Sequence, residues 1–340
     1  MIHSTQHDTT TASTTTARPT SILRRSALFT SAFVLTAGLA ATSVSAADAA
    51  GHRSSGKSQT LVGGHRTPTP TPTPTPTSTR SLLVGARSSD ISFSSMTAQL
   101  GPVKITRLFY TGTLPTRFAQ GDIPAGVKII VSYKKASANT TSYVHSVPVG
   151  VDVELAFHHE PEGPNDYLGD PSVAGPAFVK AFDAEAATVH AANPSTRIAF
   201  IGGAYQYQGG HGGDRGLGGY FMPTTADDYY LDSYQRNTIV AASEDVRVQN
   251  FIKELAARHH EFNGFTEYGR GVIPNGGSAN ADVAAARAAV IKTDATYINT
   301  LPNVDVWAYW FTTDKASNDQ WRFTDDASLK AWNVVEDANK

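Results

Sequence analysis

Residues 151–163 read VDVELAFHHEPEG, an alternating run that leads into a polar turn containing proline. Side chains along a β-strand alternate between its two faces. One row is apolar and suits packing against helices; it contains Val151, Val153, Leu155 and Phe157. The other row is mixed and contains Asp152, Glu154, Ala156, His158 and Glu160. Unless a bulge intervenes, Glu160 points to the second face where the strand ends. Glu154 lies deeper on the same face and is expected to be a buried structural acid.

Seven further segments have the same character of short apolar or alternating runs between turn residues. With the first segment they give eight predicted strands: 81–87, 103–110, 127–133, 151–158, 196–203, 228–234, 262–269 and 304–311. Amphipathic helices are predicted between several of them, at 176–193, 243–260 and 279–301. Strands that alternate with helices favour an α/β fold, a (β/α)8 TIM barrel of parallel strands.

Two connections depart from this pattern. Residues 134–150 have no convincing helical period, and residues 206–226 are rich in glycine. We therefore expect a reduced third helix and a long loop in place of the fifth helix, with a partly open barrel as the alternative. The barrel is predicted to span residues 81–340, a length close to the ~250 residues typical of this fold.

The residues before the barrel carry two other signals. Residues 1–46 contain Arg24 and Arg25, then an apolar run that ends in Val44-Ser45-Ala46, which is the layout of a secretory signal peptide. A transmembrane anchor is the alternative. Residues 47–80 include a Thr-Pro repeat, which favours an extended linker without a core. We expect a secreted, extracellular protein.

The composition excludes several function classes. The chain has 340 residues and a formal net charge of −2. It contains no cysteine, so disulfides, thiol nucleophiles and cysteine metal sites are excluded. No basic cluster indicates a nucleic-acid or membrane surface, and GGHGGDRGLGG (209–219) lacks the Lys-Ser/Thr of a phosphate-binding loop. We expect a monomer that needs no cofactor or metal and makes no membrane contact once the signal is cleaved.

Catalytic residues of such barrels lie where the strands end at their carboxyl side. Polar or aromatic residues at these positions are His158, His159, Glu160, Glu267, Arg107, Asp232, Tyr234, Trp307 and Trp310. Two glutamates from two different strands are the minimum equipment for glycoside hydrolysis. Glu162, which follows Pro161, is the alternative to Glu160 as the acid.

The sequences HHEPEG after the fourth strand and FTEYG at the seventh resemble retaining β-glycosidases that place their two glutamates on strands four and seven. The His-Glu order, RLFYTG at the second strand and the tryptophans of the eighth are similar to glycoside hydrolase family 26, the β-mannanase-type group. The resemblance implies a polysaccharide or oligosaccharide substrate, mannan or a related β-glycan, and an endo-β-mannanase-like activity.

The resemblance also implies a role for each site residue. Glu160 would be the general acid/base and Glu267 the nucleophile, while His159 would contact substrate or orient the acid. Arg107 would lie beside Glu267 and favour its ionised form, since a nearby cation lowers the pKa of a carboxyl group.

Two aromatic side chains complete the expected site. Tyr234 would donate a hydrogen bond to the nucleophile, and Trp310 would offer a flat platform for a sugar ring, whereas Trp307 is expected in the core. Two alternatives remain open: a catalytically silent carbohydrate-binding barrel tethered by the Thr-Pro spacer, and a metal site formed by His158, His159 and Glu160.

Overall fold

The computed structural model describes residues 81–161, 171–209, 218–235, 239–271, 281–314 and 319–339. The predicted signal peptide (1–46) and linker (47–80) lie outside these ranges, as do Glu162 and most of the glycine-rich segment 209–219. The limits of these predicted domains therefore stay predictions.

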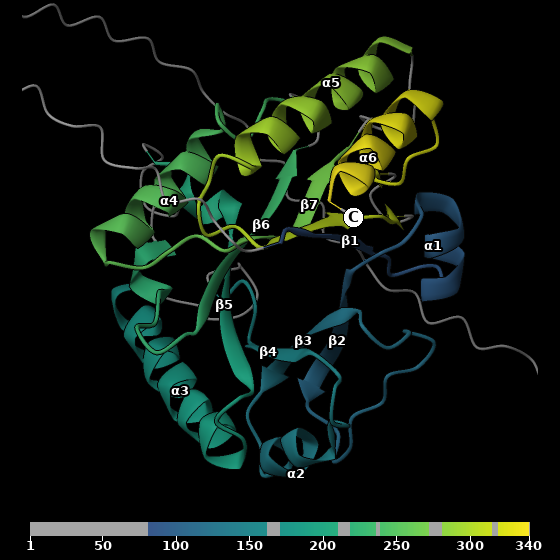
Figure 1. Ribbon diagram of the computed structural model, residues 1–340. Helices are drawn as coiled ribbons and strands as arrows, with labels where there is room; N and C mark the ends of the chain where they lie inside the picture. The colour runs from purple at the N-terminus through teal and green to yellow at the C-terminus, as the bar shows by residue number, and fades with distance from the viewer. Residues whose placement is uncertain are drawn as a thin grey trace, which may run out of the picture. The chain divides into compact units, whose positions relative to one another are not determined.

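Eight strands form at the eight predicted places (Figure 1). Their bounds are β1 Leu83–Arg87, β2 Ile105–Thr113, β3 Lys128–Lys135, β4 Val153–Phe157, β5 Arg197–Gly203, β6 Asp228–Gln235, β7 Gly264–Arg270 and β8 Val306–Trp310. The α-helices are α1 Phe93–Leu100, α2 Asn139–Ser146, α3 Pro171–Ala192, α4 Val246–Ala257, α5 Ala281–Ile298 and α6 Asp326–Ala338. Two short strands, β9 Thr313–Asp314 and β10 Asp319–Gln320, form a separate antiparallel pair.

The eight strands form one parallel sheet in the order β1-β8-β7-β6-β5-β4-β3-β2. The two ends of this order meet, because the backbone N–H of Lys104 donates to the carbonyl of Val84 over 3.0 Å. A Cβ at Gly85 would lie 2.1 Å from the carbonyl oxygen of Ile105, so only glycine permits this approach. The sheet is a nearly closed (β/α)8 barrel, and its helices lie outside the strands (Figure 1).

The connections vary more than the strands do. The third helix is short, as expected, since α2 has eight residues. The β5–β6 connection contains two 3-10 turns, η1 Ala204–Tyr207 and η2 Gly218–Phe221, in place of an α-helix in its described part. Residues 114–127 between β2 and β3 also form no helix, so the alternation of strands and helices is interrupted there as well. Among the described residues, no helix has both the length and the apolar character to span a membrane.

Two apolar layers follow the strand alternation. The outer layer joins strands to helices, and in β4 it contains Val153, Leu155 and Phe157 as expected. The inner layer fills the barrel with Ile105, Ile130, Ala156, Ala199, Ile201, Tyr230, Val306 and Ala308. Residues two positions further along these strands therefore face the barrel interior at its carboxyl rim, except after Ala156, because β4 ends at Phe157.

Glu154 is a buried structural acid, as its position in β4 predicts. Its carboxylate lies 2.8 Å from the Nζ of Lys128 and accepts a hydrogen bond from the Tyr230 hydroxyl over 3.1 Å. Burial raises the pKa of Glu154 to about 8, against the pull of Lys128. The group closes the amino-terminal end of the barrel, away from the strand ends that carry the candidate site.

Replacing Glu154 by alanine is expected to lower the free energy of unfolding by about 3 kcal/mol, because the buried Lys128 loses the carboxylate at 2.8 Å and keeps only the charges of Asp228 and Asp305. Urea denaturation followed by circular dichroism measures this difference. The double variant Glu154→Ala with Lys128→Met removes both charges and should recover part of the loss. A single variant as stable as the parent protein would contradict the assignment.

Candidate active site

Arg107 is the centre of the polar groups at the carboxyl rim. It follows the inward residue Ile105 in β2 and is fully buried. Its Nη1 lies 2.9 Å from a carboxylate oxygen of Asp232 and 2.7 Å from Oε1 of Glu267, and its Nη2 donates to the Ser132 hydroxyl over 2.7 Å. One guanidinium therefore joins side chains from β2, β3, β6 and β7.

Glu267 reaches Arg107 because β7 contains a bulge. Leu231 of β6 pairs with Phe265, but the next residue, Asp232, pairs with Glu267, so Thr266 is an extra residue. The Thr266 hydroxyl donates to Asp232 over 2.5 Å, which places Thr266 inside the barrel as well. Strict alternation from the outward Phe265 would turn Glu267 outward, so the bulge is what brings Glu267 into the site.

The expected hydrogen bond between Tyr234 and Glu267 is present. The Tyr234 hydroxyl donates to Oε2 of Glu267, so the two carboxylate oxygens have different partners, Arg107 and Tyr234. Glu267 is 6% exposed and is therefore held in one orientation with little access to water.

The pKa of Glu267 is raised well above its usual value, which differs from the expected lowering. Burial is the largest cause, and the charges of Asp232 and Glu160 add to it. Arg107 acts in the expected direction but does not outweigh burial. The pKa of Asp232 is also raised by burial. Because the rim buries both carboxyl groups almost completely, the loss of hydration outweighs the attraction of Arg107.

Glu160 reaches the site through a turn after β4. His158 and Glu160 have φ angles of 51° and 49°, the left-handed region that non-glycine residues seldom adopt. The Glu160 N–H donates to the Ile201 carbonyl of β5 over 2.8 Å, and a Cβ at Gly203 would lie 3.2 Å from Oε1 of Glu160. The Glu160 carboxyl group therefore lies against the backbone of β5, and its charge acts on both Glu267 and Arg107.

The side chains of the adjacent residues His158 and His159 point to different parts of the molecule. His158 packs against Phe178 of α3, with ring centroids 6.2 Å apart, so it does not continue the inward row as alternation predicts. His159 lies in the site against Phe109, at 5.4 Å between ring centroids. Burial lowers the pKa of His159 well below its usual value, and the charges of Arg107 and Lys134 lower it further, so its imidazole is neutral. Within the described ranges, no three His, Asp or Glu side chains gather as a metal site.

Aromatic side chains border the carboxylates. Trp310 follows the inward residue Ala308, is partly exposed, and lies 6.2 Å from Phe109 and 6.4 Å from Tyr234 between ring centroids. Trp307 is fully buried in the outer core, as expected. Trp310 and Phe109 thus offer apolar faces next to the glutamates, the surface on which a sugar ring stacks.

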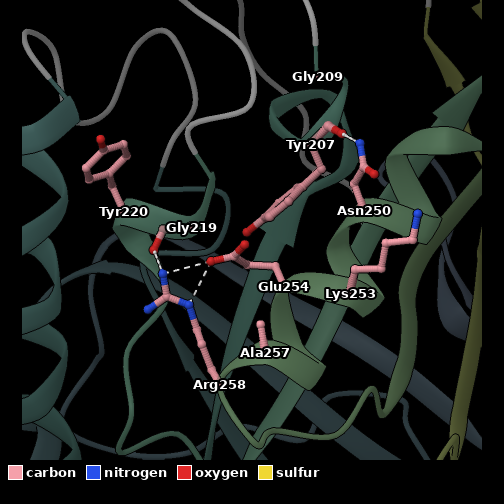
Figure 2. Close-up of a pocket in the computed structure, with 9 residues that line it drawn as sticks. All are labelled: Tyr207, Gly209, Gly219, Tyr220, Asn250, Lys253, Glu254, Ala257 and Arg258. Carbon is pink, nitrogen blue, oxygen red and sulfur yellow. Dashed lines mark hydrogen bonds and ion pairs between the residues drawn. The ribbon is translucent and has the colours of Figure 1, made fainter. Parts of the chain in front are cut away.

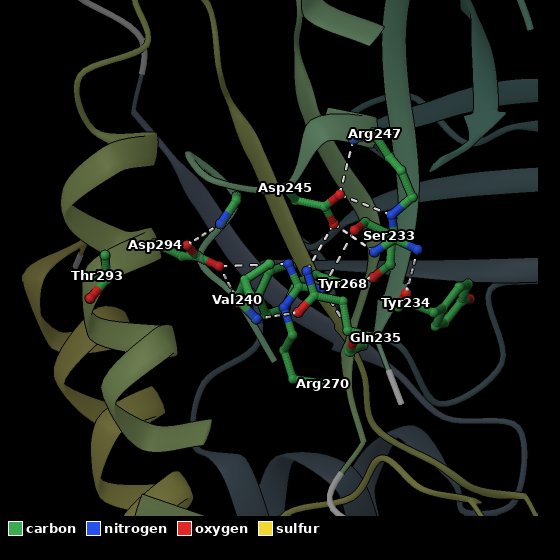
Figure 3. Close-up of polar contacts among 12 residues, drawn as sticks. Ser233, Tyr234, Gln235, Val240, Asp245, Arg247, Tyr268, Arg270, Thr293 and Asp294 are labelled. Atoms are coloured by element: carbon green, nitrogen blue, oxygen red, sulfur yellow. Dashed lines mark hydrogen bonds and ion pairs between the residues drawn. The ribbon is translucent and has the colours of Figure 1, made fainter. Parts of the chain in front are cut away.

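A polar network behind the rim supports the strands that carry Tyr234 and Glu267 (Figure 3). Arg247 donates to the Tyr234 carbonyl over 3.2 Å and forms an ion pair of 2.6 Å with Asp245. Arg270, at the end of β7, donates to the Ser233 carbonyl of β6 over 3.2 Å. These bonds hold the ends of β6 and β7 in place relative to each other. They therefore also hold the Tyr234 hydroxyl, which donates, and the Glu267 carboxylate, which accepts.

A cavity of about 640 Å³ lies elsewhere, between α4 and the two 3-10 turns (Figure 2). Arg258 forms an ion pair of 2.8 Å with Glu254 there and donates to the Gly219 carbonyl. Its lining includes none of the six predicted site residues. The candidate active site is therefore the carboxyl rim of the barrel.

The structure brings all six predicted residues to this rim: Glu160, Glu267, His159, Arg107, Tyr234 and Trp310. Sequence reasoning missed Ser132, Thr266, Phe109 and Arg87. The inward row of each strand would have indicated Ser132, Phe109 and Arg87, because they continue the rows of Ile130, Ile105 and Leu83. No sequence signal indicated the bulge at Thr266.

Comparisons with known proteins find likeness among solved structures. No family model matches it, and no curated protein matches it in sequence. Among solved structures, it is similar to a glycoside hydrolase family 128 (subgroup I) endo-β-1,3-glucanase from Amycolatopsis mediterranei, with 15% identity, a TM-score of 0.47 and coverage of 74% of this chain and 98% of that one.

Two other solved structures are similar to the same extent. One is a family 128 (subgroup III) curdlan-specific exo-β-1,3-glucanase from Blastomyces gilchristii (13% identity, TM-score 0.46, covering 76% and 100%). The other is a glucosidase from Croceicoccus marinus, with 13% identity, a TM-score of 0.45 and coverage of 76% of this chain and 68% of that one. At these values the likeness is one of fold, and membership of the mannanase-type family stays a prediction.

Proposed function

We propose that this protein is a secreted retaining β-glycoside hydrolase that cleaves a polysaccharide, mannan or a related β-glycan, by double displacement. One observation carries the proposal: Glu267, oriented by Arg107 and Tyr234, shares the barrel rim with Glu160, which comes from a different strand end. Two carboxyl groups at ~5–5.5 Å are what a retaining mechanism requires.

In the first step, Glu160 protonates the glycosidic oxygen while Glu267 attacks the anomeric carbon. The bond to the leaving sugar breaks, and an ester forms between Glu267 and the remaining sugar. In the second step, the Glu160 carboxylate takes a proton from water, the water oxygen attacks the anomeric carbon, and Glu267 is released. The product keeps the β configuration because the anomeric carbon is inverted once in each step.

The neighbours of the glutamates suit these steps. Arg107 and Tyr234 stabilise the charge that returns to Glu267 when the ester is cleaved, because Arg107 forms an ion pair with one carboxylate oxygen and Tyr234 donates a hydrogen bond to the other. The neutral His159 and the faces of Phe109 and Trp310 border the space for the sugar ring.

The pH dependence follows from Glu267. The nucleophile must be ionised, and its pKa is raised, so activity is lost as the pH falls through that raised value. The acid limb of kcat/KM is expected well above the ~4.3 of an ordinary glutamate. Arg107→Gln removes the cation at 2.7 Å and should move the limb upward by about 1 unit or more, whereas Arg107→Lys should move it less. An unmoved limb in Arg107→Gln would count against Glu267 as the titrating nucleophile.

A reducing-sugar screen tests the proposed function. The panel contains mannans, xylans, galactans and β-glucans, including the β-1,3-glucans named for the similar structures, with Glu267→Gln as the control. Release of oligosaccharides by the parent protein but not by the variant supports an endo-acting hydrolase. Binding to a polysaccharide without any release would favour the silent carbohydrate-binding barrel.

Secretion and a monomeric state belong to the same proposal, and both are measured on protein expressed from the full-length sequence. Amino-terminal sequencing of protein from the culture medium should find a start after Ala46. Light scattering should give the mass of one chain.

A further inference from the structure

Arg87 is a rim residue to which the proposed mechanism gives no role. It ends β1 and pairs in register with Trp310 of β8, and paired residues of parallel strands point to the same side of the sheet. Its guanidinium carbon lies 5.5 Å from the ring centroid of Phe109, whose ring also lies 4.6 Å from the guanidinium carbon of Arg107. Arg87 therefore borders the space between the aromatic side chains and Glu267.

The polar atoms of Arg87 lack the partners that the other rim arginine has. Its guanidinium donates no hydrogen bond and forms no ion pair with any residue that the structure describes, although the charge of Glu267 acts on it. Arg107, in contrast, contacts Asp232, Glu267 and Ser132. Burial lowers the pKa of Arg87 and the charge of Arg107 lowers it further, while the nearby Glu267 acts in the opposite direction.

We propose that Arg87 is a substrate-binding residue whose guanidinium donates hydrogen bonds to oxygen acceptors of the sugar ring between Phe109, Trp310 and Glu267. The planar fork of an arginine suits two neighbouring acceptors, such as two adjacent hydroxyl groups or a carboxylate. The inference rests on the proposed function, because it assumes that a sugar occupies this space.

Binding to inactive protein tests the inference apart from catalysis. Titration calorimetry compares Glu267→Gln with the double variant Glu267→Gln, Arg87→Gln, using a hexasaccharide of the polysaccharide that the screen identifies. The affinity should fall about 10- to 100-fold, as for the loss of a charged hydrogen-bond donor. The double variant Glu267→Gln, Arg87→Lys keeps the charge without the planar fork, so its affinity should lie between those of the other two proteins. Arg258→Gln in the Glu267→Gln background, at the residue that follows α4 and outside the site, should bind the hexasaccharide like Glu267→Gln alone.

Kinetics in the active protein separate binding from an effect on the nucleophile. Arg87→Gln should raise KM and lower kcat/KM, and it should move the acid limb upward by less than Arg107→Gln does, because Arg87 lowers the pKa of Glu267 less than Arg107 does. Unchanged affinity, with an acid limb moved to higher pH, would overturn the inference, because Arg87 would then act only as a charge near Glu267. Failure of Glu267→Gln itself to bind any oligosaccharide would overturn the proposed function together with it.

Matched ligands identify the acceptor. β-1,4-Mannohexaose and the β-1,4-linked hexamer of mannuronic acid differ only in carrying a hydroxymethyl group or a carboxylate on each ring. A similar loss of affinity with both ligands assigns hydroxyl groups to Arg87, and a loss confined to the uronic acid assigns the carboxylate. An equal affinity of the variant and its parent for both ligands would contradict the proposal.

Discussion

Glu267→Ala is expected to lower kcat roughly 10⁴- to 10⁶-fold, because no other group can form the covalent intermediate. Arg107 and Tyr234 hold both oxygens of Glu267, so the position cannot be taken over by a neighbouring carboxylate. The carboxylate of Asp232 is itself held by Arg107 and by the Thr266 hydroxyl. Initial rates on the best polysaccharide of the screen measure the loss.

Adding azide tests whether the lost activity is that of the nucleophile. In Glu267→Ala the anion can enter the space left by the carboxylate and attack an activated aryl β-glycoside directly. One displacement inverts the anomeric carbon, so the product should be the α-glycosyl azide. Glu254→Gln, on the surface of α4, is the matched control and should turn over like the parent protein. A variant at Glu267 with substantial activity and no azide effect would contradict its role.

Glu160→Ala is expected to lower kcat/KM about 10²- to 10⁴-fold on polysaccharides, whose leaving groups need a proton. The loss should be much smaller on aryl glycosides with good leaving groups, since their departure needs no acid. Comparing the two substrate types measures the difference directly.

Azide should give the opposite stereochemistry in this variant. The Glu267 ester still forms, and azide then opens it by a second inversion, so the product should be the β-glycosyl azide. Equal losses on polysaccharide and activated aryl glycoside, without a β-azide product, would contradict Glu160 as the acid/base. Activity that disappears only in Glu162→Ala would assign the role to the alternative residue.

The sequence predicts the strands well because parallel barrel strands are apolar over short runs and end at clear turn residues. All eight form, and the inner and outer rows of β4 hold from Val153 to Phe157. The helix-free connection 114–127 was not foreseen, since a loop closed by long-range contacts has no period of its own.

The site was predictable in its members and not in its geometry. Their places at the strand ends indicated Arg107, Tyr234 and Trp310, but Glu267 enters through a bulge and Glu160 through left-handed residues. Both devices cost conformational energy locally and depend on partners far along the chain, such as Asp232 and Ile201. A single sequence read for periodicity does not contain that information.

The central claim is that Glu267 forms a covalent bond to the substrate. The most direct measurement is to trap that intermediate with an activated 2-deoxy-2-fluoro-β-glycoside of the preferred sugar and to locate the label by peptide mass spectrometry. The account predicts one added sugar per chain, attached to Glu267 and absent in Glu267→Gln. A label on any other residue, or a first product released in the α configuration, would contradict it.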